Sequence, residues 1–425
     1  MTSVSVDDAA LVSHIRDTHA HLGDMVRQHH EFTVTATLPI GDFLAHLIQW
    51  TGKPAGELLQ VLRGSSDVSL GVAKAELAAL ASALNANAEA HAILNGPESA
   101  SAIIKTLQAH PTIASPLKAY LDLVEVRCFG YDLCAKSLGE MPELIVRTIQ
   151  SAVKGEGATS NDARLTQDRI STLRNAVPAE HQASFDALLE EAVFINRLRD
   201  ERGHYSDGWA VGIARRALGE AGRRLVARGT FASADSAYDA SLDEIIALLA
   251  GKPGPSDTEL IARAAWRKEK TSSDPDIPVW LGAPPSPPPP SAWLPEKGRR
   301  ADQAIGTFLG TMFIAHESHS TTQSVKGLSV SPGVYEGIAR VVNHESEFGR
   351  IQQGDVLVTR STSPYFNVVL PLLGAIVTDR GGQLFHAAIV AREYGIPAVV
   401  GTTDACKDGA RVRVDGATGE VTVLA

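Results

Sequence analysis

The sequence predicts a multi-domain protein of the α plus α/β class, with a large all-α N-terminal region, a Pro-rich linker and a C-terminal α/β domain. Three observations predict this order. Apolar residues recur every three or four positions over residues 7–250, as in amphipathic helices. Proline and glycine dominate the stretch that follows, and short β-branched runs fill the remainder. A chain of 425 residues, 44% hydrophobic and 21% charged, suits roughly two to four folded domains.

The N-terminal region, residues 1–250, reads as one helix after another with Pro or Gly at the joins. "AKAELAALASALNANAEAHAILNG" (73–96) and "SFDALLEEAVFINRLRDERG" (184–203) show the helical spacing. We expect a single helical domain here.

Residues 251–325 form the expected linker. The runs "GKPGPSDTE" and "GAPPSPPPPSAWLPEKG" cannot continue a helix, and their prolines favour an extended, semi-rigid spacer. One short helix is expected in this linker, at "ADQAIGTFLGTMFIA" (301–315).

The C-terminal domain, residues 326–425, is expected to be α/β. Its candidate strands are "GVYEGIARVV", "DVLVTR", "GAIVTD", "PAVVGT", "ARVRVD" and "EVTVLA". One good helix interrupts them, "HAAIVARE", which begins at His386 after a glycine pair and ends at Gly395.

A histidine in the first turn of that helix suits phosphoryl chemistry. A helix start presents unpaired N–H groups and the positive end of the helix dipole, and both stabilise a phosphoryl group. A neutral imidazole is a good nucleophile. A lone histidine at a helix start is, however, more often a cap or a surface residue, so the position of His386 alone leaves both interpretations open.

The bulk composition excludes several classes of protein. A formal net charge of −10 and 5% aromatic residues give no general basic surface for nucleic acid or anionic membranes. Cys128, Cys134 and Cys406 match no zinc or disulfide pattern and suit a reducing cytoplasm. No membrane span or signal peptide is expected, and no metal site on this chain.

The segment "GGQLFHAAIVAREYGIPAVVG" (381–401) resembles the signature of the swivelling phosphohistidine domain of the PEP-utilising enzymes. Residues 329–342, 354–379 and 409–424 resemble the opening strands, the middle and the closing hairpin of that domain. The resemblance implies that His386 carries the phosphoryl group. It also gives Thr378, Gly381, Gly382 and Arg392 as signature positions, which we expect to shape the phosphate site. Arg392 also suits a structural ion pair. Phe385 departs from the signature, because a small polar residue is common there, and its role is open.

The helical region resembles the substrate-binding domain of rifampin phosphotransferase in "VEVRCFGYDLCAKSLGEMPEL" (124–144) and in residues 195–229. Neither an ATP-grasp nor a Walker-type nucleotide motif is recognised. The resemblance therefore implies a hetero-oligomer in which a separate ATP-grasp subunit holds Mg²⁺ and ATP, as in the enzymes that phosphorylate phenol or 4-methylphenol. No tightly bound cofactor is expected on this chain.

The acceptor site is expected around "RLRDERGHYSDGW" (197–209). Arg199 and Arg202, one helical turn apart, are candidates to clamp phosphate oxygens, and His204, just past an expected helix break at Gly203, is the candidate base. Further candidates complete the set: Asp200 or Asp207 to orient His204, and Arg127, Tyr205 and Trp209 to bind substrate. A charged helix end with an ordinary surface histidine would give the same sequence pattern.

The resulting hypothesis is a cytoplasmic phosphotransferase subunit that transfers phosphate from ATP through His386 to a phenol or aromatic alcohol such as 4-methylphenol, with release of AMP and phosphate. A PEP/pyruvate dikinase-type fragment and a non-catalytic phosphocarrier or regulatory protein are the alternatives. The sequence leaves open the acceptor, the oligomeric state and whether contact with the partner is stable or transient.

Overall fold

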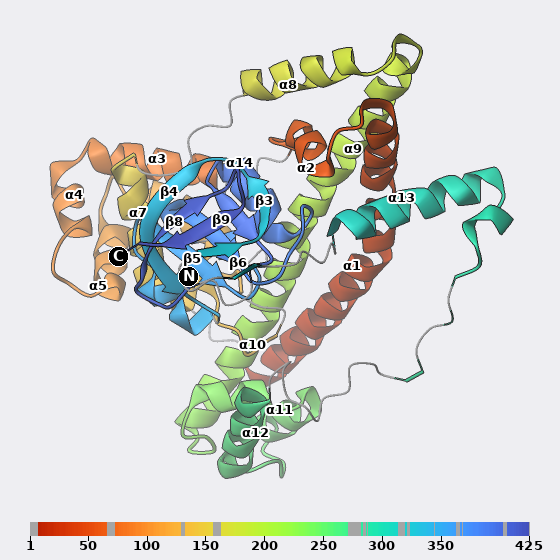
Figure 1. Ribbon diagram of the computed structural model, residues 1–425. Coiled ribbons are helices and arrows are strands. Elements are labelled where there is room, and N and C mark those ends of the chain that lie inside the picture. The colour runs from red at the N-terminus through yellow and green to blue at the C-terminus, as the bar shows by residue number, and fades with distance from the viewer. Residues whose placement is uncertain are drawn as a thin grey trace.

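The computed structural model describes residues 7–65, 73–128, 132–155, 163–270, 282–283, 286, 288–312, 319–320, 324–343, 345–362, 366–367, 369–402 and 406–424. It does not describe the side chains of residues 34, 163, 200, 204, 205, 319–320 and 345–346. The protein is of the predicted multi-domain class, with a large helical region followed by a sheet domain (Figure 1). The exact domain limits at residues 250 and 325 stay predictions.

Two long helical rods cross the molecule diagonally (Figure 1). The first is α1 (Asp8–Thr51), whose start is capped by the Asp7 carboxylate accepting from the amide of Ala10 at 2.8 Å. The second joins α9 (Gln182–Arg202) to α10 (Gly208–Ala227) through a π turn, Gly203–Asp207. The helix break predicted at Gly203 is therefore wrong. Gly203 has ordinary right-handed angles, φ −56° and ψ −30°, so the helix continues through one wider π turn at this point.

Shorter helices make up the rest of the described helical region. Among the described residues, every helix is too short or too polar to cross a membrane. The shorter α-helices are α2 (Ala55–Leu58), α3 (Lys74–Asn85), α4 (Ala88–Leu94), α5 (Ala100–Ala109), α6 (Ala114–Val124), α7 (Pro142–Val153), α8 (Ala163–Ala176) and α11 (Leu242–Leu249). The described 3₁₀ helices are η1 (Leu59–Leu62), η3 (Leu138–Glu140), η4 (Ala179–His181), η6 (Ala234–Asp239), η7 (Ser291–Trp293), η8 (Glu345–Arg350) and η10 (Leu370–Leu372).

The expected linker contains two described α-helices, so the prediction of one short helix is wrong. The unforeseen helix is α12 (Asp257–Glu269), which starts where the Ser256 side chain accepts from the amide of Glu259. The prolines just before it obscured this start signal. The other helix, α13 (Glu296–Met312), lies along α1, and Arg300 on α13 makes a two-point ion pair with Asp42 on α1 at 2.6–3.1 Å.

Among the residues that the structure describes, the sheet domain has nine strands in the order β1-β2-β9-β8-β4-β5-β6-β7-β3. The central pairs β4–β5, β5–β6 and β6–β7 are parallel, and the other pairs are antiparallel. The strands are β1 (His319–Ser320), β2 (Ser324–Lys326), β3 (Leu328–Ser331), β4 (Val334–Val341), β5 (Asp355–Thr359), β6 (Leu373–Thr378), β7 (Ala398–Val400), β8 (Arg411–Asp415) and β9 (Glu420–Val423). All six predicted runs are strands.

The parallel strands are buried on both faces. On one face, Leu357, Ile376 and Val400 share a hydrophobic core with α14 (His386–Tyr394) and with residues of α3, α5, α6 and α7. On the other face, Val356 and Val377 pack against the β8 and β9 residues. The sheet domain therefore docks on the helical region through a continuous apolar core, with α3 to α7 on one side and the long rods on the other (Figure 1).

Candidate functional site

His386 is the first residue of α14, as predicted from the sequence. The preceding strand β6 ends at Thr378, and Gly381 then takes φ +149°, a value that side-chain-bearing residues rarely adopt. Helix α14 ends at Gly395 in the left-handed conformation, φ +67°. Glycine angles at both ends thus fix where the helix starts and stops, and place the imidazole at its N-terminus.

Both ring nitrogens of His386 have polar neighbours. The Thr362 hydroxyl lies 2.9 Å from Nδ1, and the Asn367 Oδ1 lies 2.8 Å from Nε2. Burial, with a smaller contribution from the Arg199 guanidinium, lowers the pKa of His386 from 6.5 to about 3. The imidazole is therefore neutral at physiological pH, the form that can attack phosphorus. One of the two neighbours must turn away before a phosphoryl group can bind.

The loop before α14 is closely packed against the end of α13. A Cβ atom on Gly382 would lie 2.1 Å from the carbonyl oxygen of Met312, so only glycine fits there. The Gln383 amide donates to the carbonyl of Thr311 at 3.3 Å. Thr378 is buried, and its hydroxyl donates to the carbonyl of Arg380 at 2.8 Å, which holds the turn at the end of β6.

Arg392 is buried inside this domain. Its guanidinium donates to the carbonyl of Gln383 at 2.6 Å, to the Gln383 side chain at 3.2 Å and to the carbonyl of Val330 at 3.4 Å. Burial lowers the pKa of Arg392 to about 10, so the group stays charged at neutral pH. Its described contacts hold the loop that carries His386, which is a supporting position behind the helix start.

Phe385 occupies the N-cap position of α14, with φ −72° and ψ 155°. Its side chain has no oxygen to accept from the first-turn amides, and no side-chain cap is formed. A hydrophobic N-cap thus leaves the capping of the helix start to another acceptor.

Arg199 joins the helical region to the phosphohistidine candidate. From α9 it donates to the carbonyl of Leu384 at 3.1 Å, two residues before His386, and its guanidinium lies 5.4 Å from the centre of the Phe308 ring. Its charge is one of the two causes that lower the pKa of His386. Of the residues predicted for the acceptor site, Arg199 is brought next to the predicted phosphate site.

Arg202, one turn further along α9, points toward α1. It donates to the carbonyl of His29 at 3.1 Å and to the Thr33 hydroxyl at 3.3 Å, and it covers the Phe32 ring at 5.2 Å. The side chains of Asp200, His204 and Tyr205 lie outside the described part of the structure.

The remaining predicted residues lie near α6. Trp209 donates from its indole nitrogen to the carbonyl of Leu123 at 3.4 Å. Arg127 lies beside Gly208, and its charge acts on the buried Tyr120. The described contacts do not bring these two residues to His386.

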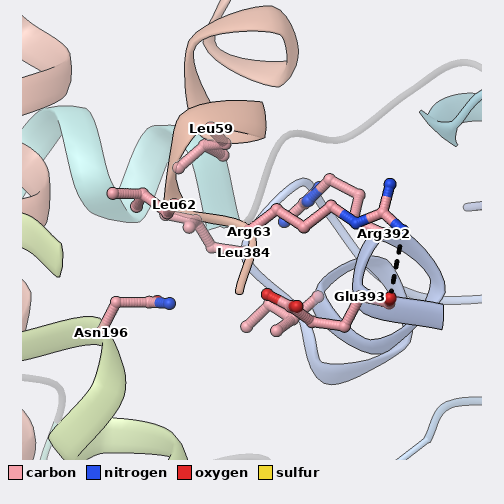
Figure 2. Close-up of a pocket in the computed structure, with 8 residues that line it drawn as sticks. Leu59, Leu62, Arg63, Asn196, Leu384, Arg392 and Glu393 are labelled. Atoms are coloured by element: carbon pink, nitrogen blue, oxygen red, sulfur yellow. Dashed lines mark hydrogen bonds between the residues drawn. The ribbon is translucent and has the colours of Figure 1, made fainter. Parts of the chain in front are cut away.

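A second contact between the helical region and the sheet domain involves Glu393, which is buried (Figure 2). Its carboxylate accepts from the amide of Gly64 at 2.8 and 3.1 Å, and Arg63 donates to its carbonyl at 3.3 Å. Beside this contact is a cavity of about 10 Å³, lined in part by Leu62, Asn196 and Leu384. It has room for about one water molecule and not for an aromatic substrate.

Sequence reasoning missed Thr362, Asn367 and the pairing of Asp207 with His29, whose Nδ1 lies 2.6 Å from the Asp207 carboxylate. Thr362 and Asn367 follow β5, the parallel neighbour of β6, so their loop reaches the same sheet edge as the His386 loop. That shared edge was a usable signal. Among the described residues, no group of three or more His, Cys, Asp or Glu is placed to hold a metal ion.

Comparisons with known proteins give one match in the sheet domain and a separate match in the helical region. Residues 351–419 match the family model "PEP-utilising enzyme, mobile domain", and residues 30–202 match "Rifampicin phosphotransferase fourth domain". The first range contains His386, Thr362 and Asn367, and the second contains Arg199 and Arg202. The comparisons thus divide the site between the two matched regions.

Two curated relatives match parts of the chain of different length. The chain is 26% identical over 303 residues to the uncharacterized phosphotransferase YvkC of Bacillus subtilis, covering 69% of this chain and 34% of that protein. It is 50% identical over 101 residues to phosphoenolpyruvate synthase of Aeropyrum pernix, covering 23% of this chain and 12% of that enzyme. The chain thus spans about a third or less of the length of these curated relatives. A solved structure of Thermococcus kodakaraensis aconitase X matches 24% of this chain and 98% of its own, at 23% identity and a TM-score of 0.21, too low to support an argument.

Proposed function

We propose a function from one premise: the chain combines the mobile domain of the PEP-utilising enzymes with a helical region of the rifampicin phosphotransferase type. In this proposal His386 receives a phosphoryl group and passes it to a hydroxyl acceptor bound by the helical region. The donor is ATP held with Mg²⁺ by a separate ATP-grasp subunit, which releases AMP and phosphate. The acceptor is a phenol or aromatic alcohol, such as 4-methylphenol.

The observation that carries the proposal is the position of His386. A neutral imidazole stands at the start of a helix, without a side-chain cap, and within the field of the Arg199 guanidinium. A phosphoryl group on this ring would gain the helix amides and dipole on one side and the arginine charge on the other. Both features favour a phosphorylated histidine over a plain surface residue.

The chain's own residues suggest how the transfer is organised. Thr362 and Asn367 fix the plane of the ring from its two sides, and release of one of them frees a nitrogen for the phosphoryl group. Arg199 then neutralises charge that builds up on the equatorial oxygens during transfer. The proposal assigns this contact to the acceptor half of the cycle, because Arg199 belongs to the helical region.

The small cavity beside Glu393 suggests that the acceptor does not enter through a finished pocket at that contact. We assign acceptor entry to a state in which the sheet domain has moved away from α9, and transfer to the docked state. Such a movement also allows His386 to reach a donor on another subunit.

The first experiment avoids the unidentified partner. Phosphoramidate, a small-molecule phosphoryl donor, is incubated with the full chain, and phosphohistidine is followed by ³¹P NMR and mass spectrometry. One phosphoryl group should appear on His386 and be absent from His386→Ala. His91→Ala, which removes an exposed histidine on α4, is the matched control and should be phosphorylated like the wild type. Phosphorylation of His386→Ala at the wild-type rate would refute the proposal.

The second experiment tests donor and acceptor together. The chain, a candidate ATP-grasp subunit, Mg²⁺ and ATP are mixed with 4-methylphenol, and AMP and aryl phosphate are measured. AMP and phosphohistidine without any phosphorylated phenol or alcohol would favour a phosphocarrier. A specific observation favours one further candidate: the roughly 50% identity to phosphoenolpyruvate synthases over about a hundred residues suggests PEP as the phosphoryl partner. In that case a PEP-binding subunit, and not an ATP-grasp subunit alone, would be needed for turnover.

A further inference from the structure

The helical region contains a histidine–aspartate pair that the sequence did not predict. His29 is on α1 and Asp207 is the last residue of the π turn, 178 positions away. The Nδ1 of His29 lies 2.6 Å from the Asp207 carboxylate. Asp207 is 4% exposed, whereas the His29 side chain is 25% exposed, so the ring connects a buried carboxylate to a more open space.

Several contacts fix the geometry of this pair. Arg202, immediately before the π turn, donates to the carbonyl of His29 and to the Thr33 hydroxyl, which ties the start of the turn to α1 at the histidine and one helical turn beyond it. The neighbouring His30 ring packs edge-on against His29 with the ring centres 5.4 Å apart. A π turn inside a long helix is uncommon, and such turns are frequent at functional sites.

Asp207 lies on the same helical rod as Arg199, which contacts the loop of His386, and His29 meets Asp207 from α1. Arg199 donates to the carbonyl of Leu384, and Arg202 is three residues further along α9. At a rise of about 1.5 Å per residue, the two arginines are separated by about 5 Å along the axis. One stretch of α9 thus contacts both the loop that carries His386 and the backbone of His29, and our proposal places the acceptor hydroxyl between the two histidines.

We propose that His29 is the general base that takes the proton from the acceptor hydroxyl, and that Asp207 positions it. This role rests on the proposed function. A carboxylate that accepts from Nδ1–H holds the imidazole in the tautomer whose Nε2 is basic.

In the proposed step, the hydroxyl proton passes to Nε2 of His29 as the hydroxyl oxygen bonds to phosphorus. The P–N bond to His386 breaks, and its electron pair stays on the ring nitrogen, which takes up a proton from solvent. His29 then returns its proton to solvent. The net change is that the acceptor gains the phosphoryl group and His386 regains a proton.

The transfer step can be measured alone. The chain is phosphorylated with phosphoramidate, freed of donor and mixed with 4-methylphenol, and the decay of phosphohistidine and the growth of aryl phosphate are followed in a single turnover. His29→Gln should slow this transfer by about 10²-fold or more, the usual scale for loss of a general base. Asp207→Asn should slow it less, and imidazole added to His29→Ala should restore part of the rate.

A second acceptor separates base catalysis from a structural effect. 4-Nitrophenol ionises far more readily than 4-methylphenol, so it needs less help from a base, and His29→Gln should slow its transfer much less. Equal slowing with both phenols, or no slowing with either, would overturn the proposal. His21→Gln removes an exposed histidine from the same helix and should leave both rates unchanged.

The tautomer of His29 gives a readout that does not depend on turnover. Nitrogen-15 NMR of the histidine rings should show His29 with a protonated Nδ1, and this signature should be lost in Asp207→Asn. A proton on Nε2 in the wild type would overturn the role of His29, whatever the kinetics show. Failure of His386 to accept phosphate would instead refute the proposed function. A phosphorylated His386 that transfers to neither phenol would overturn the acceptor class and, with it, the role of His29.

Discussion

The neutral state of His386 makes the stability of the protein depend on pH. Its pKa is about 3 in the folded protein, against 6.5 for the free side chain. Between these values the unfolded chain binds more protons, so the contribution of His386 is complete above about pH 6.5 and is lost as the pH falls toward 3. By about pH 5 the loss should approach 2 kcal/mol, at about 1.4 kcal/mol per unit.

Urea unfolding at pH 7.5 and at about pH 5 checks this prediction. The wild type should lose more stability between the two conditions than His386→Gln, which cannot be protonated. Since other histidines and carboxylates also titrate in this range, the difference between the two proteins is the relevant quantity. An identical pH dependence in both would mean that His386 is not held neutral by the fold.

Arg199 should affect transfer of the phosphoryl group to an acceptor more than it affects phosphorylation of His386. Arg199→Ala removes the donor to Leu384 and the charge next to His386, so we expect phosphoramidate to label His386 normally while transfer to an acceptor slows by 10-fold or more. Arg197→Ala is the matched control, because Arg197 is 58% exposed on the same helix and pairs with Glu201. Equal transfer rates in wild type and Arg199→Ala would remove Arg199 from the site.

At the scale of elements, the contact of Gly382 with the end of α13 should hold the loop that carries His386 in place. Gly382→Ala places a Cβ atom 2.1 Å from the Met312 carbonyl, and backbone cannot yield cheaply. We expect a loss of about 1–3 kcal/mol in unfolding free energy and faster amide exchange at the α13 end. Hydrogen exchange and thermal unfolding would measure both.

Two glycines inside α13 should tolerate alanine, in contrast to Gly382. Cβ atoms on Gly306 and Gly310 would meet no atom within 4 Å, and alanine is the better helix former. Gly306→Ala should therefore stabilise the protein by up to about 1 kcal/mol, as measured by its unfolding midpoint. Destabilisation would indicate that α13 does not form a regular helix along α1 in solution.

Some helices and strands could be predicted from the sequence and others could not. Helix α14 and strands β4 to β9 follow from local signals, since glycine pairs and β-branched runs act within a few residues. The continuity of α9 into α10 does not, because a glycine in a right-handed conformation looks the same in sequence as a glycine that breaks a helix. Helix α12 was missed since proline content outweighed the Ser256 cap.

At the scale of the whole molecule, the contact between Glu393 and Gly64 holds the sheet domain to the segment after η1. Glu393→Gln keeps the size of the side chain but replaces a charged acceptor, so the contact should weaken by about 1–2 kcal/mol. The amide of Gly64 should then exchange roughly 10-fold faster in native-state hydrogen exchange. Glu420→Gln, at the exposed first residue of β9, is a control that should leave this amide unchanged.

In the candidate site, too, the features that could be predicted are those set by residues close together in the sequence. His386 could be named from sequence because its helix, glycines and signature lie within one segment. The supporting groups come from distant segments: Arg199 reaches Leu384 across 185 positions, and His29 reaches Asp207 across 178. Only the packing of α1, α9 and the sheet domain brings these together, and that packing is spread over many apolar residues that carry no individual signal.

The π turn at Gly203–Asp207 has a consequence for the direction in which α10 faces. Each residue advances an α-helix by about 100°, so the wider turn acts as a one-residue offset between the two ends of the rod. Deleting one residue within it would remove the offset and leave α10 facing nearly the same way, whereas tightening it to a regular helix with every residue kept would rotate α10 by about a quarter turn relative to α9. In the tightened helix the arginines of α9 would keep their places while Asp207 turned away from α1, so the turn sets the phase between Arg199, which contacts the loop of His386, and the pair that we propose for proton acceptance.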